Sequence, residues 1–559
     1  MIAIAPGIFL ITKVVVMKIN VFKFAGSLLI SFFLAAAASP QTSIFQAEYI
    51  STNHIKMWVN NYGEGSHNPY TDGPGFYWPS PSDTEKTLIY SDGLFWMGKV
   101  GSEIYGSGQV TTSSTVPGIV SDGSTTNVND TKIYKAKRLQ AISLNGLQAN
   151  QFEVDLGNWA AEIGAPYFDL NNDGKYDPEF DKPQIYGDEM LWMVFHDNYP
   201  MFMGWSGEHL FKIGMEIQST VYAFKKTNLL GDVIFKKYKL INKGTQTVDS
   251  MFFSYYSDPD VGYASDDYVG CDSALSLAFA YNASDKDTIY GYHPPAVGYA
   301  LLQGPVVKSS INDSAFVDNK IITGYKNLDA TSFNLSFPSR WDPGWPRDPS
   351  VWEYWNFVRG LLWDGRPFVD PHLGTPTKFP LNGDPYRQTG WYEGGGWAGI
   401  QPPWLNRKML LNSGPFTMAP GDTQEVVYAI LAGQGSSNTA SVEELKKMVP
   451  RLQYFHKNYS PPVPEIKEEK KQLDFKMTQN YPNPFNSQTV IHYQIPLESR
   501  VIIKVYDVLG NEVALLKNEL QKPGDYQTVF NANNLASGIY ILNISAREFF
   551  SSRKMILLR

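Results

Sequence analysis

Hydrophobic runs typical of strands dominate the chain between residues 41 and 457. Strand-forming residues gather in runs separated by turns rich in glycine, asparagine and aspartate, at residues 215–222, 233–241, 248–256 and 425–431. Runs of β-branched and aromatic residues bounded by such turns are typical of strands. The pattern predicts a mostly β body of one or two β-sandwiches with long loops.

One stretch has helical instead of strand periodicity. Apolar residues recur at helical spacing from Val442 to Leu452, and Ser441 with Glu444 forms a capping-box pattern in front of them. We therefore expect a helix near residues 441–456 that closes the body. Proline removes a backbone donor, so Pro450 predicts a kink or an early end.

The body is followed by a change in composition at residues 458–473. This segment is rich in proline and then in charge, with little that could enter a core, and it is predicted to be an interdomain linker. Strand-like alternation returns at residues 501–506 and 538–544. Residues 474–559 are therefore predicted to form a second, smaller β-sandwich.

This smaller domain opens with the run Asn480-Tyr481-Pro482-Asn483-Pro484-Phe485-Asn486. Its two prolines are incompatible with a central strand and predict a rigid extended lead-in. Together with residues 505–513, residues 535–542 and the basic Arg553-Lys554-Met555, the run resembles the type A C-terminal sorting domain of the bacterial type IX secretion system. The residues that carry the sorting motif are Tyr481, Pro482, Asn483, Pro484, Phe485, Gly510, Gly538 and Tyr540.

The resemblance implies an Ig-like domain that carries its cargo across the outer membrane of Bacteroidetes-type bacteria. The implied partners are the type IX secretion machinery and its sortase-like peptidase, which removes the tail. The product is then released or attached to surface lipopolysaccharide, and the sequence does not separate these two outcomes. The alternative is an ordinary Ig-like module used for packing.

The beginning of the chain agrees with export. Residues 17–40 have a short basic region, an apolar core and small residues before Pro40, which is the layout of a signal peptide. We expect a signal peptide within residues 1–40, with Met17 as the start. No later apolar run approaches about 18 residues, so no transmembrane segment is expected in the mature protein.

Composition narrows the function further. The net charge of −8 argues against nucleic acid or anionic membranes as partners. The one cysteine, Cys271, excludes an internal disulfide. These features suit a secreted or cell-surface protein.

Parts of the body also resemble large extracellular proteins that carry the same tail and have no established activity, at residues 92–99, 258–262, 265–272, 383–391 and 413–422. That resemblance transfers no catalytic residue.

The segment from Asp169 to Asp181 resembles the first part of an EF-hand-like calcium loop. Oxygen-bearing side chains stand at positions 1, 3, 5 and 9, glycine stands at position 6, and position 7 offers its carbonyl. Position 12 is Phe180, so Glu179 or Asp181 would have to close the site. The alternative is an Asx-turn loop that binds nothing. The predicted structural calcium ligands are Asp169, Asn171, Asp173, Lys175, Asp177 and Asp181.

A second group of acids follows the run that ends at residue 256. Carboxylates at this density repel one another unless a cation or hydrogen bonds neutralise them. The group is a candidate second metal site, against the alternative of a solvated turn. Its members are Asp258, Asp260, Asp266, Asp267 and Asp272.

Tryptophans gather between residues 341 and 404, with neither strand nor helical spacing. Their rings could stack on sugars, which makes glycan a candidate ligand, or they could fill a loop-rich core. The tryptophans are Trp341, Trp345, Trp352, Trp355, Trp363, Trp391, Trp397 and Trp404.

Catalysis has little support in the sequence, which contains no metalloprotease, serine-hydrolase or phosphate-binding motif. A secreted carbohydrate-active enzyme remains the alternative function, with Glu353, Asp364 and Glu393 as its candidate acids. The favoured function is an exported structural, adhesive or ligand-binding protein with calcium-stiffened loops.

Overall fold

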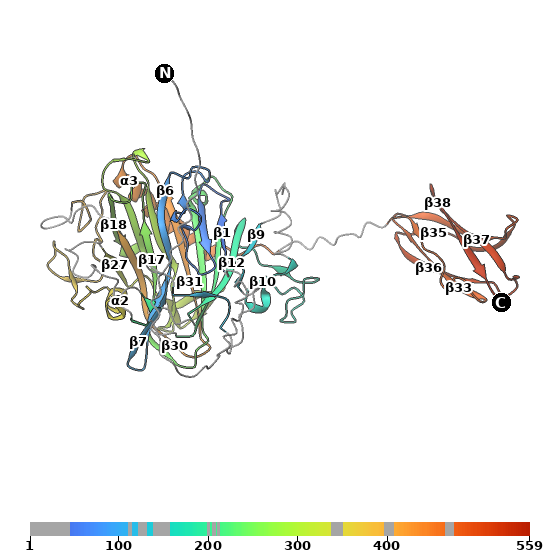
Figure 1. Cartoon of the computed structure of the whole chain (residues 1–559), viewed down its shortest axis with the longest axis horizontal. Helices are drawn as coiled ribbons and strands as arrows, with labels where there is room; N and C mark the ends of the chain where they lie inside the picture. Colours follow the sequence, from blue (N-terminus) through green and yellow to red (C-terminus); the bar gives the residue numbers. More distant parts are fainter. Residues whose placement is uncertain are drawn as a thin grey trace, which may run out of the picture. The chain divides into compact units, whose positions relative to one another are not determined.

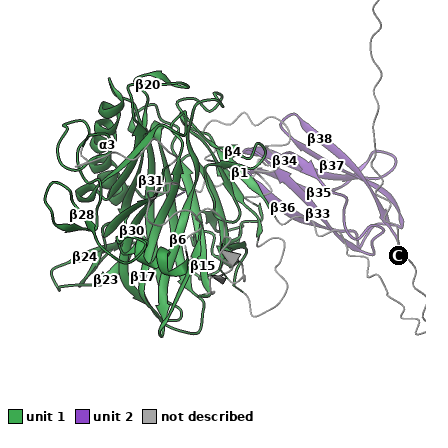
Figure 2. Cartoon of the chain, turned by 60° about the vertical axis from the view of Figure 1, so that its left-hand side comes forward, with its two compact units in different colours: residues 1–461 green, residues 462–559 purple. Residues whose placement is uncertain are grey.

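The computed structural model describes residues 45–109, 114–120, 131–137, 157–197, 202–203, 208–209, 213–336, 350–395, 407–463 and 474–559. The predicted signal peptide lies outside these residues. The chain divides into two compact units, Met1–Pro461 and Pro462–Arg559 (Figure 2), and the division falls within the predicted linker. The prediction of a mostly β protein is confirmed.

The body is built on two large antiparallel sheets (Figure 1). In the first, β7 (Glu103–Gly108) pairs with β6, and the remaining strands follow in spatial order: β1 (Ala47–Ile50), β2 (Lys56–Asn60), β5 (Phe76–Tyr77), β6 (Thr87–Val100), β17 (Val248–Pro259), β30 (Lys408–Met418) and β27 (Ser332–Ser336).

The second sheet has β16 near its centre, and β9 (Tyr134–Lys137) pairs with β12 beside its edge. Its strands follow in spatial order: β18 (Asp267–Asp272), β19 (Leu277–Asn282), β22 (Ala296–Gln303), β31 (Thr423–Gly433), β16 (Val233–Asn242), β15 (Met215–Ala223), β12 (Glu189–His196) and β8 (Val116–Pro117).

The two sheets pack face to face as a sandwich. Inward side chains such as Phe253 of β17 and Ile430 of β31 belong to one buried cluster that draws on both sheets. Within this interface, Lys236 of β16 donates to Asp92 of β6 at 2.7 Å, and neither side chain is exposed by more than 1%. Tyr255 donates to the other oxygen of Asp92 at 2.9 Å.

Two helices cover the outer faces of the sandwich. The helix α3 (Asn438–Asn458) packs its apolar residues, including Leu445 and Leu452, against the second sheet. It starts three residues before the predicted helix, because Ser437 and not Ser441 caps its first turn, and it continues past Pro450. The short helix α2 (Val351–Val358) covers the first sheet.

Small elements decorate the body between these strands. They include the 3-10 helices η3 (Ala161–Ile163), η4 (Leu229–Asp232) and η5 (Ser273–Leu275). The other described elements of the body are two-stranded sheets: β3 (His67–Asn68) with β4 (Gly73–Pro74), β10 (Tyr167–Phe168) with β11 (Lys182–Pro183), β13 (Phe202–Met203) with β14 (Glu208–His209), β20 (Lys286–Asp287) with β21 (Gly291–Tyr292), β23 (Val306–Lys308) with β26 (Tyr325–Asn327), β24 (Ser314–Val317) with β25 (Lys320–Thr323), and β28 (Phe368–Val369) with β29 (Pro376–Thr377).

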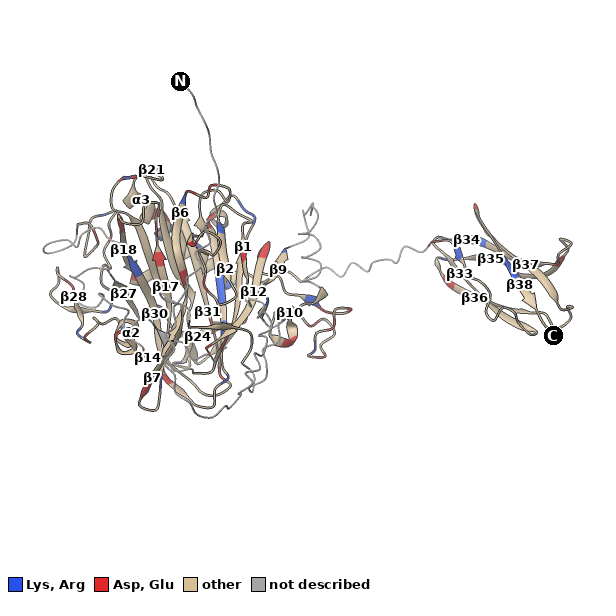
Figure 3. Cartoon of the chain, viewed as in Figure 1, with Lys and Arg blue, Asp and Glu red and all other residues tan. Residues whose placement is uncertain are grey.

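The second unit is a small two-sheet domain with its own core. Phe485, Val505 and Leu542 lie in this core and are almost completely buried. One sheet has the order β32 (Lys476–Met477), β33 (Gln488–Ile495), β36 (Gly524–Asn531), and the other has the order β35 (Glu512–Gln521), β34 (Ser499–Tyr506), β37 (Gly538–Ala546), β38 (Phe549–Leu557). Positive and negative residues are interspersed in both units (Figure 3).

Candidate functional site

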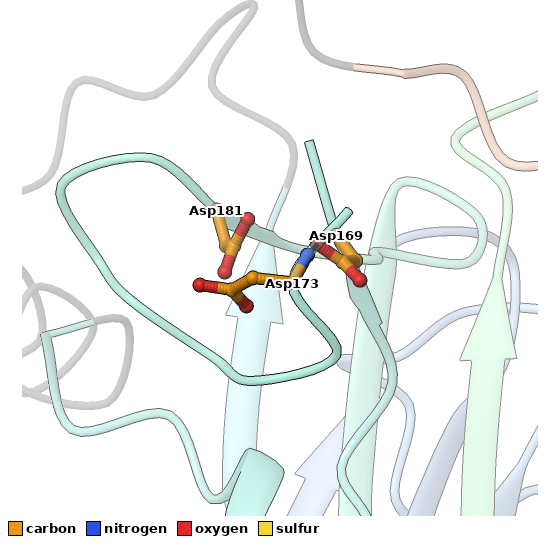
Figure 4. Close-up of side chains that lie close together, drawn as sticks. All are labelled: Asp169, Asp173 and Asp181. Atoms are coloured by element: carbon orange, nitrogen blue, oxygen red, sulfur yellow. Dashed lines mark hydrogen bonds between the residues drawn. The ribbon is translucent and has the colours of Figure 1, made fainter. Parts of the chain in front are cut away.

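The candidate calcium loop is the connection between β10 and β11. These strands pair with Phe168 opposite Lys182, so Asp169 and Asp181, the next residues inward, stand at the two ends of the loop. The hairpin thereby brings together two carboxylates that are twelve positions apart in the sequence. Asp173 comes from the middle of the loop, and ligand oxygens of the three residues all lie within 4.8 Å of one another (Figure 4).

Hydrogen bonds hold the first half of the loop in a tight turn. Asp169 accepts from the backbone N–H of Gly174 at 2.9 Å and of Asp173 at 3.2 Å. Asp173 accepts from the N–H of Lys175 at 2.8 Å. Gly174 has a φ of +76° with open space around its Cα, so the positive φ and not crowding requires glycine there.

Asp181 fixes the second half of the loop. It is completely buried and accepts from the N–H of Leu170 at 2.9 Å and of Asp177 at 2.8 Å. Phe180, at the position where an acid is expected, is 54% exposed. Asp181 therefore occupies the place of a closing acid, one residue later than in an EF-hand-like loop.

The other predicted ligands have subsidiary places in the loop. The Asn171 amide donates to Asp173 at 3.0 Å, and Asp177 accepts from the N–H of Glu179 at 2.9 Å. Burial raises the pKa of Tyr176, and the negative charge of Asp181 adds to the effect. Three carboxylates with oxygen ligands only suit a hard cation such as calcium.

The five acids of the second group contact different partner residues. Asp272 pairs with Lys446 at 3.2 Å, and Asp266 accepts from Asn282 at 2.9 Å. Asp258 lies 3.3 Å from Lys408. Among the described residues, only the loop of Asp169, Asp173 and Asp181 places three such ligand atoms mutually within 4.8 Å.

Three members of this group, Asp258, Asp260 and Asp267, are buried. Burial raises the pKa of Asp260 to about 7, with a further contribution from the charge of Asp258. Burial also raises the pKa of Asp267 well above its ordinary value. The raised pKa values favour the protonated form of the Asp260 and Asp267 carboxyls.

The described tryptophans of the 341–404 segment do not form one surface. Trp355 lies in the cluster beneath α2, and Trp391 lies in the core between the sheets. Trp363 packs partly buried beside Trp355, and Trp352 is 64% exposed. The other tryptophans predicted to bind a ligand lie outside the described residues. They are Trp341, Trp345, Trp397 and Trp404.

Each candidate catalytic acid already has a structural partner. Glu353 accepts from the N–H of Ser350 at 2.6 Å in the capping box of α2. Asp364 accepts from Arg366 at 2.6 Å. Glu393 pairs with Arg407 and accepts from the N–H of Val269 at 2.8 Å.

The first part of the sorting motif, from Asn483 to Phe485, lies along one edge of β38. Asn483 donates to the carbonyl of Lys554 at 3.1 Å and accepts from the N–H of Ile556 at 2.8 Å. Phe485 forms a bridge to Leu557 and is buried in the core. The run with the two prolines thus covers an edge that would otherwise be open for pairing.

The remaining motif residues lie in a turn, at the start of a strand and in the core. Gly510 has a φ of +86°, which glycine adopts without strain, and Gly538 begins β37. The hydroxyl of Tyr540 donates to the carbonyl of Ala536 at 2.8 Å. Tyr481, by contrast, is 79% exposed.

Comparisons with known proteins identify the second unit. The search of curated proteins finds no match. One solved structure similar to this chain is a polysaccharide lyase, with 10% identity and a TM-score of 0.18. The alignment covers 66% of this chain and 39% of the lyase. Among the described residues, no helix is long and apolar enough to cross a membrane.

Residues 479–558 match the family described as the secretion system C-terminal sorting domain. The match spans every sorting-motif residue named above, and it confirms the assignment of the tail. The second unit therefore belongs to the C-terminal sorting domains of the type IX secretion system, and the chain is a secreted or cell-surface protein.

Proposed function

We propose that the body is a non-catalytic surface module, structural or adhesive, whose loop between β10 and β11 is stiffened by calcium. The observation that carries the proposal is the convergence of Asp169, Asp173 and Asp181 within 4.8 Å. Calcium would neutralise three carboxylates that otherwise repel one another across this distance. The loop would then be held in one conformation outside the cell.

The three acids differ in their hydrogen bonds and exposure, and this difference supports the proposal. Asp169 and Asp181 accept hydrogen bonds from backbone N–H groups, which restricts the conformations of the loop even without a cation. Asp173 is exposed, and it presents its carboxylate to the two others. A loop that is shaped in advance loses little conformational freedom on binding, which favours affinity.

The carbohydrate-active enzyme is the less favoured function. A glycosidase needs two carboxyls about 5 to 9.5 Å apart, both directed at a substrate. Glu353, Asp364 and Glu393 instead accept hydrogen bonds from a helix terminus, a neighbouring arginine and a buried arginine, respectively. In each case the carboxylate uses these hydrogen bonds to stabilise the fold.

The proposal is tested by melting the full chain with calcium and with excess chelator. Tryptophan fluorescence reports on the body alone, because residues 474–559 contain no tryptophan. Calcium is expected to raise the melting temperature by a few degrees, and Asp173→Ala is expected to abolish that increment. The matched control is Asp507→Ala, which removes a similar Asx turn from the sorting domain. Identical melts with calcium and with chelator would contradict the proposal.

A further inference from the structure

The buried pair of Lys236 and Asp92 connects the two sheets of the body. Lys236 lies on the inward face of β16 between Ile234 and Tyr238, and Asp92 lies on the inward face of β6, two residues before Leu94. All three neighbours belong to the apolar cluster between the sheets. The Lys236 Nζ lies 2.7 Å from the Asp92 Oδ1, and the two side chains are 1% and 0% exposed. An amine and a carboxyl that are 144 positions apart in the sequence therefore meet where water is excluded.

The ammonium of Lys236 has few hydrogen-bond partners in this place. An ammonium has three donors, and within the described part of the chain Asp92 is the only acceptor that it reaches. The ring of Tyr255 lies nearby, with its centroid 5.5 Å from Nζ. Burial lowers the pKa of Lys236, although the charges of Asp92 and Glu64 oppose this effect. The environment thus favours the neutral amine, which is a nucleophile.

Asp92 is held in place by contacts from two sides. The Tyr255 hydroxyl donates to the second carboxylate oxygen, Oδ2, at 2.9 Å. Burial raises the pKa of Tyr255 well above its ordinary value, so the hydroxyl remains a donor. The Gly65 N–H donates to the Asp92 carbonyl at 2.8 Å, and the Gly65 carbonyl accepts from the Asp92 N–H at 2.9 Å. A Cβ on Gly65 would clash with the Lys236 Nζ and the Asp92 Oδ1, so only glycine leaves room for the pair.

We propose that Lys236 and Asp92 form an intramolecular amide bond that links the two sheets covalently. The ammonium first passes one proton to the Asp92 Oδ1. The neutral amine then attacks Cγ and forms the C–N bond, while Tyr255 stabilises the negative charge that develops on Oδ2. The bond between Cγ and Oδ1 breaks, and Oδ1 takes a second proton from the nitrogen and leaves as water. The amide nitrogen keeps the third hydrogen, and nothing is oxidised or reduced.

The surroundings of the pair favour this condensation. The two groups are held in contact on neighbouring sheets, and such proximity accelerates a reaction by many orders of magnitude. Burial excludes the water that would solvate the ions or hydrolyse the product. The amide N–H needs one acceptor, whereas the buried ammonium needs three. The one cysteine of the chain permits no internal disulfide, so the amide would give the body a covalent crosslink that it otherwise lacks.

The adjacent pair of Lys237 and Glu425 provides a contrast within the same strand. Lys237 points to the opposite face of β16 and is 15% exposed, and its Nζ lies 2.5 Å from the Glu425 Oε2. It also lies 3.6 Å from Asp318. Burial acts to lower the pKa of Lys237, but the charge of Glu425 outweighs this effect and raises the pKa. Lys237 therefore stays protonated, and we expect no amide at this pair.

The test is tryptic digestion of the purified, denatured full chain, followed by mass spectrometry. Without the amide, trypsin cuts after Lys236 and releases residues 87–99 and 227–236 as separate peptides. With the amide, residues 87–99 and 227–237 form one branched peptide that is lighter than their sum by one water. We expect the branched peptide from most molecules. Recovery of mainly separate peptides would overturn the proposal.

Fragmentation of the peptides locates the bond and distinguishes it from another dehydration. Asp92 precedes Gly93, and an Asp-Gly sequence can also lose water by closing on its own backbone. A separate peptide 87–99 that has lost one water would therefore overturn the proposal. Cleavage after Lys237 in the branched peptide assigns the bond to Lys236, because trypsin does not cut after a lysine whose amine is acylated. A branch at Lys237 instead would also overturn the proposal.

Three variants test the assigned roles. Lys236→Met removes the amine, and the branched peptide is expected to disappear. The matched control Lys237→Met removes the adjacent amine and should retain the branch at Lys236. Tyr255→Phe removes the donor to Oδ2 and is expected to lower the branched fraction severalfold; an unchanged fraction would overturn the role of Tyr255. The measurement on the natural chain decides the proposal even if a variant does not fold.

Discussion

The Glu393 carboxylate and the Arg407 guanidinium lie 2.7 Å apart, and both side chains are completely buried. Glu393 also accepts from the N–H of Val269, and its carbonyl accepts from Tyr281 at 2.6 Å. Burial raises the pKa of Glu393, and the positive charge of Arg407 opposes that rise. These bonds connect Glu393 to the edge strand β18 and to its neighbour β19.

Breaking this pair should destabilise the body strongly. In Glu393→Gln the guanidinium of Arg407 stays buried without its counter-charge, and a loss of about 3–5 kcal/mol in the free energy of unfolding is expected. Urea unfolding followed by tryptophan fluorescence measures it. The comparison is Asp364→Asn, which breaks a pair with the exposed Arg366 and should cost less than about 1 kcal/mol. Equal losses would show that the burial of the Glu393 pair has no energetic consequence.

Two tryptophans three residues apart on α2 should behave differently. Trp355 is 3% exposed and contacts Phe252 with ring centroids 5.9 Å apart, whereas Trp352 is 64% exposed. Trp355→Ala is expected to cost about 3–5 kcal/mol because it leaves a cavity. Trp352→Ala should change stability by less than about 0.5 kcal/mol. Urea unfolding provides both values, and a large loss from Trp352→Ala would contradict this placement.

The alternation of the sequence predicts the class of the fold, and it fails where both faces of a strand are buried. Lys236 lies in a run whose alternation places polar residues toward water, yet it is 1% exposed between two sheets. The strand β15 is buried along its whole length, including Glu216 and Gln218. Helices and strands that are distant in the sequence decide which strands are covered on both faces. The local pattern of residues therefore cannot predict these strands.

The candidate loop is predicted from local spacing because its hydrogen bonds are local. Asp169 and Asp173 bond to N–H groups within five residues, which the sequence contains. The partner of Glu393 is different, because Arg407 is 14 positions away in the sequence and no local spacing pattern connects the two residues. On β34, Ile502 and Tyr506 occupy outward positions that alternation would assign to polar residues.

The acids of the candidate loop should separate calcium binding from loop stability. Asp181→Ala leaves the N–H groups of Leu170 and Asp177 without their acceptor, so a loss of about 1–3 kcal/mol is expected even with chelator. Asp173→Ala should cost little with chelator. In the natural chain, calcium at 100 times its dissociation constant should add about 2.7 kcal/mol. Urea unfolding in both conditions tests this, and an equal calcium increment in Asp173→Ala would contradict it.

The buried Asp260 should make stability depend on pH. Its pKa is about 7 in the folded protein, raised by burial and by Asp258 and opposed by Lys408. In the unfolded chain an aspartate titrates near pH 4. Between these values the folded state binds the extra proton, so this contribution is fully present below about pH 4 and is lost as the pH rises to about 7.

The variant Asp260→Asn isolates this contribution, because asparagine keeps the shape of the side chain and does not titrate. The difference in unfolding free energy between the natural chain and the variant should fall by at most about 4 kcal/mol from pH 4 to pH 7. Urea unfolding at several pH values measures it. The control is Asp364→Asn. Burial acts to raise the pKa of Asp364, but hydrogen bonds from Arg366 outweigh this effect and lower the pKa. The difference in unfolding free energy between the natural chain and Asp364→Asn should therefore stay constant above pH 5. Parallel curves for the natural chain and Asp260→Asn would show that Asp260 is ionised in the folded protein.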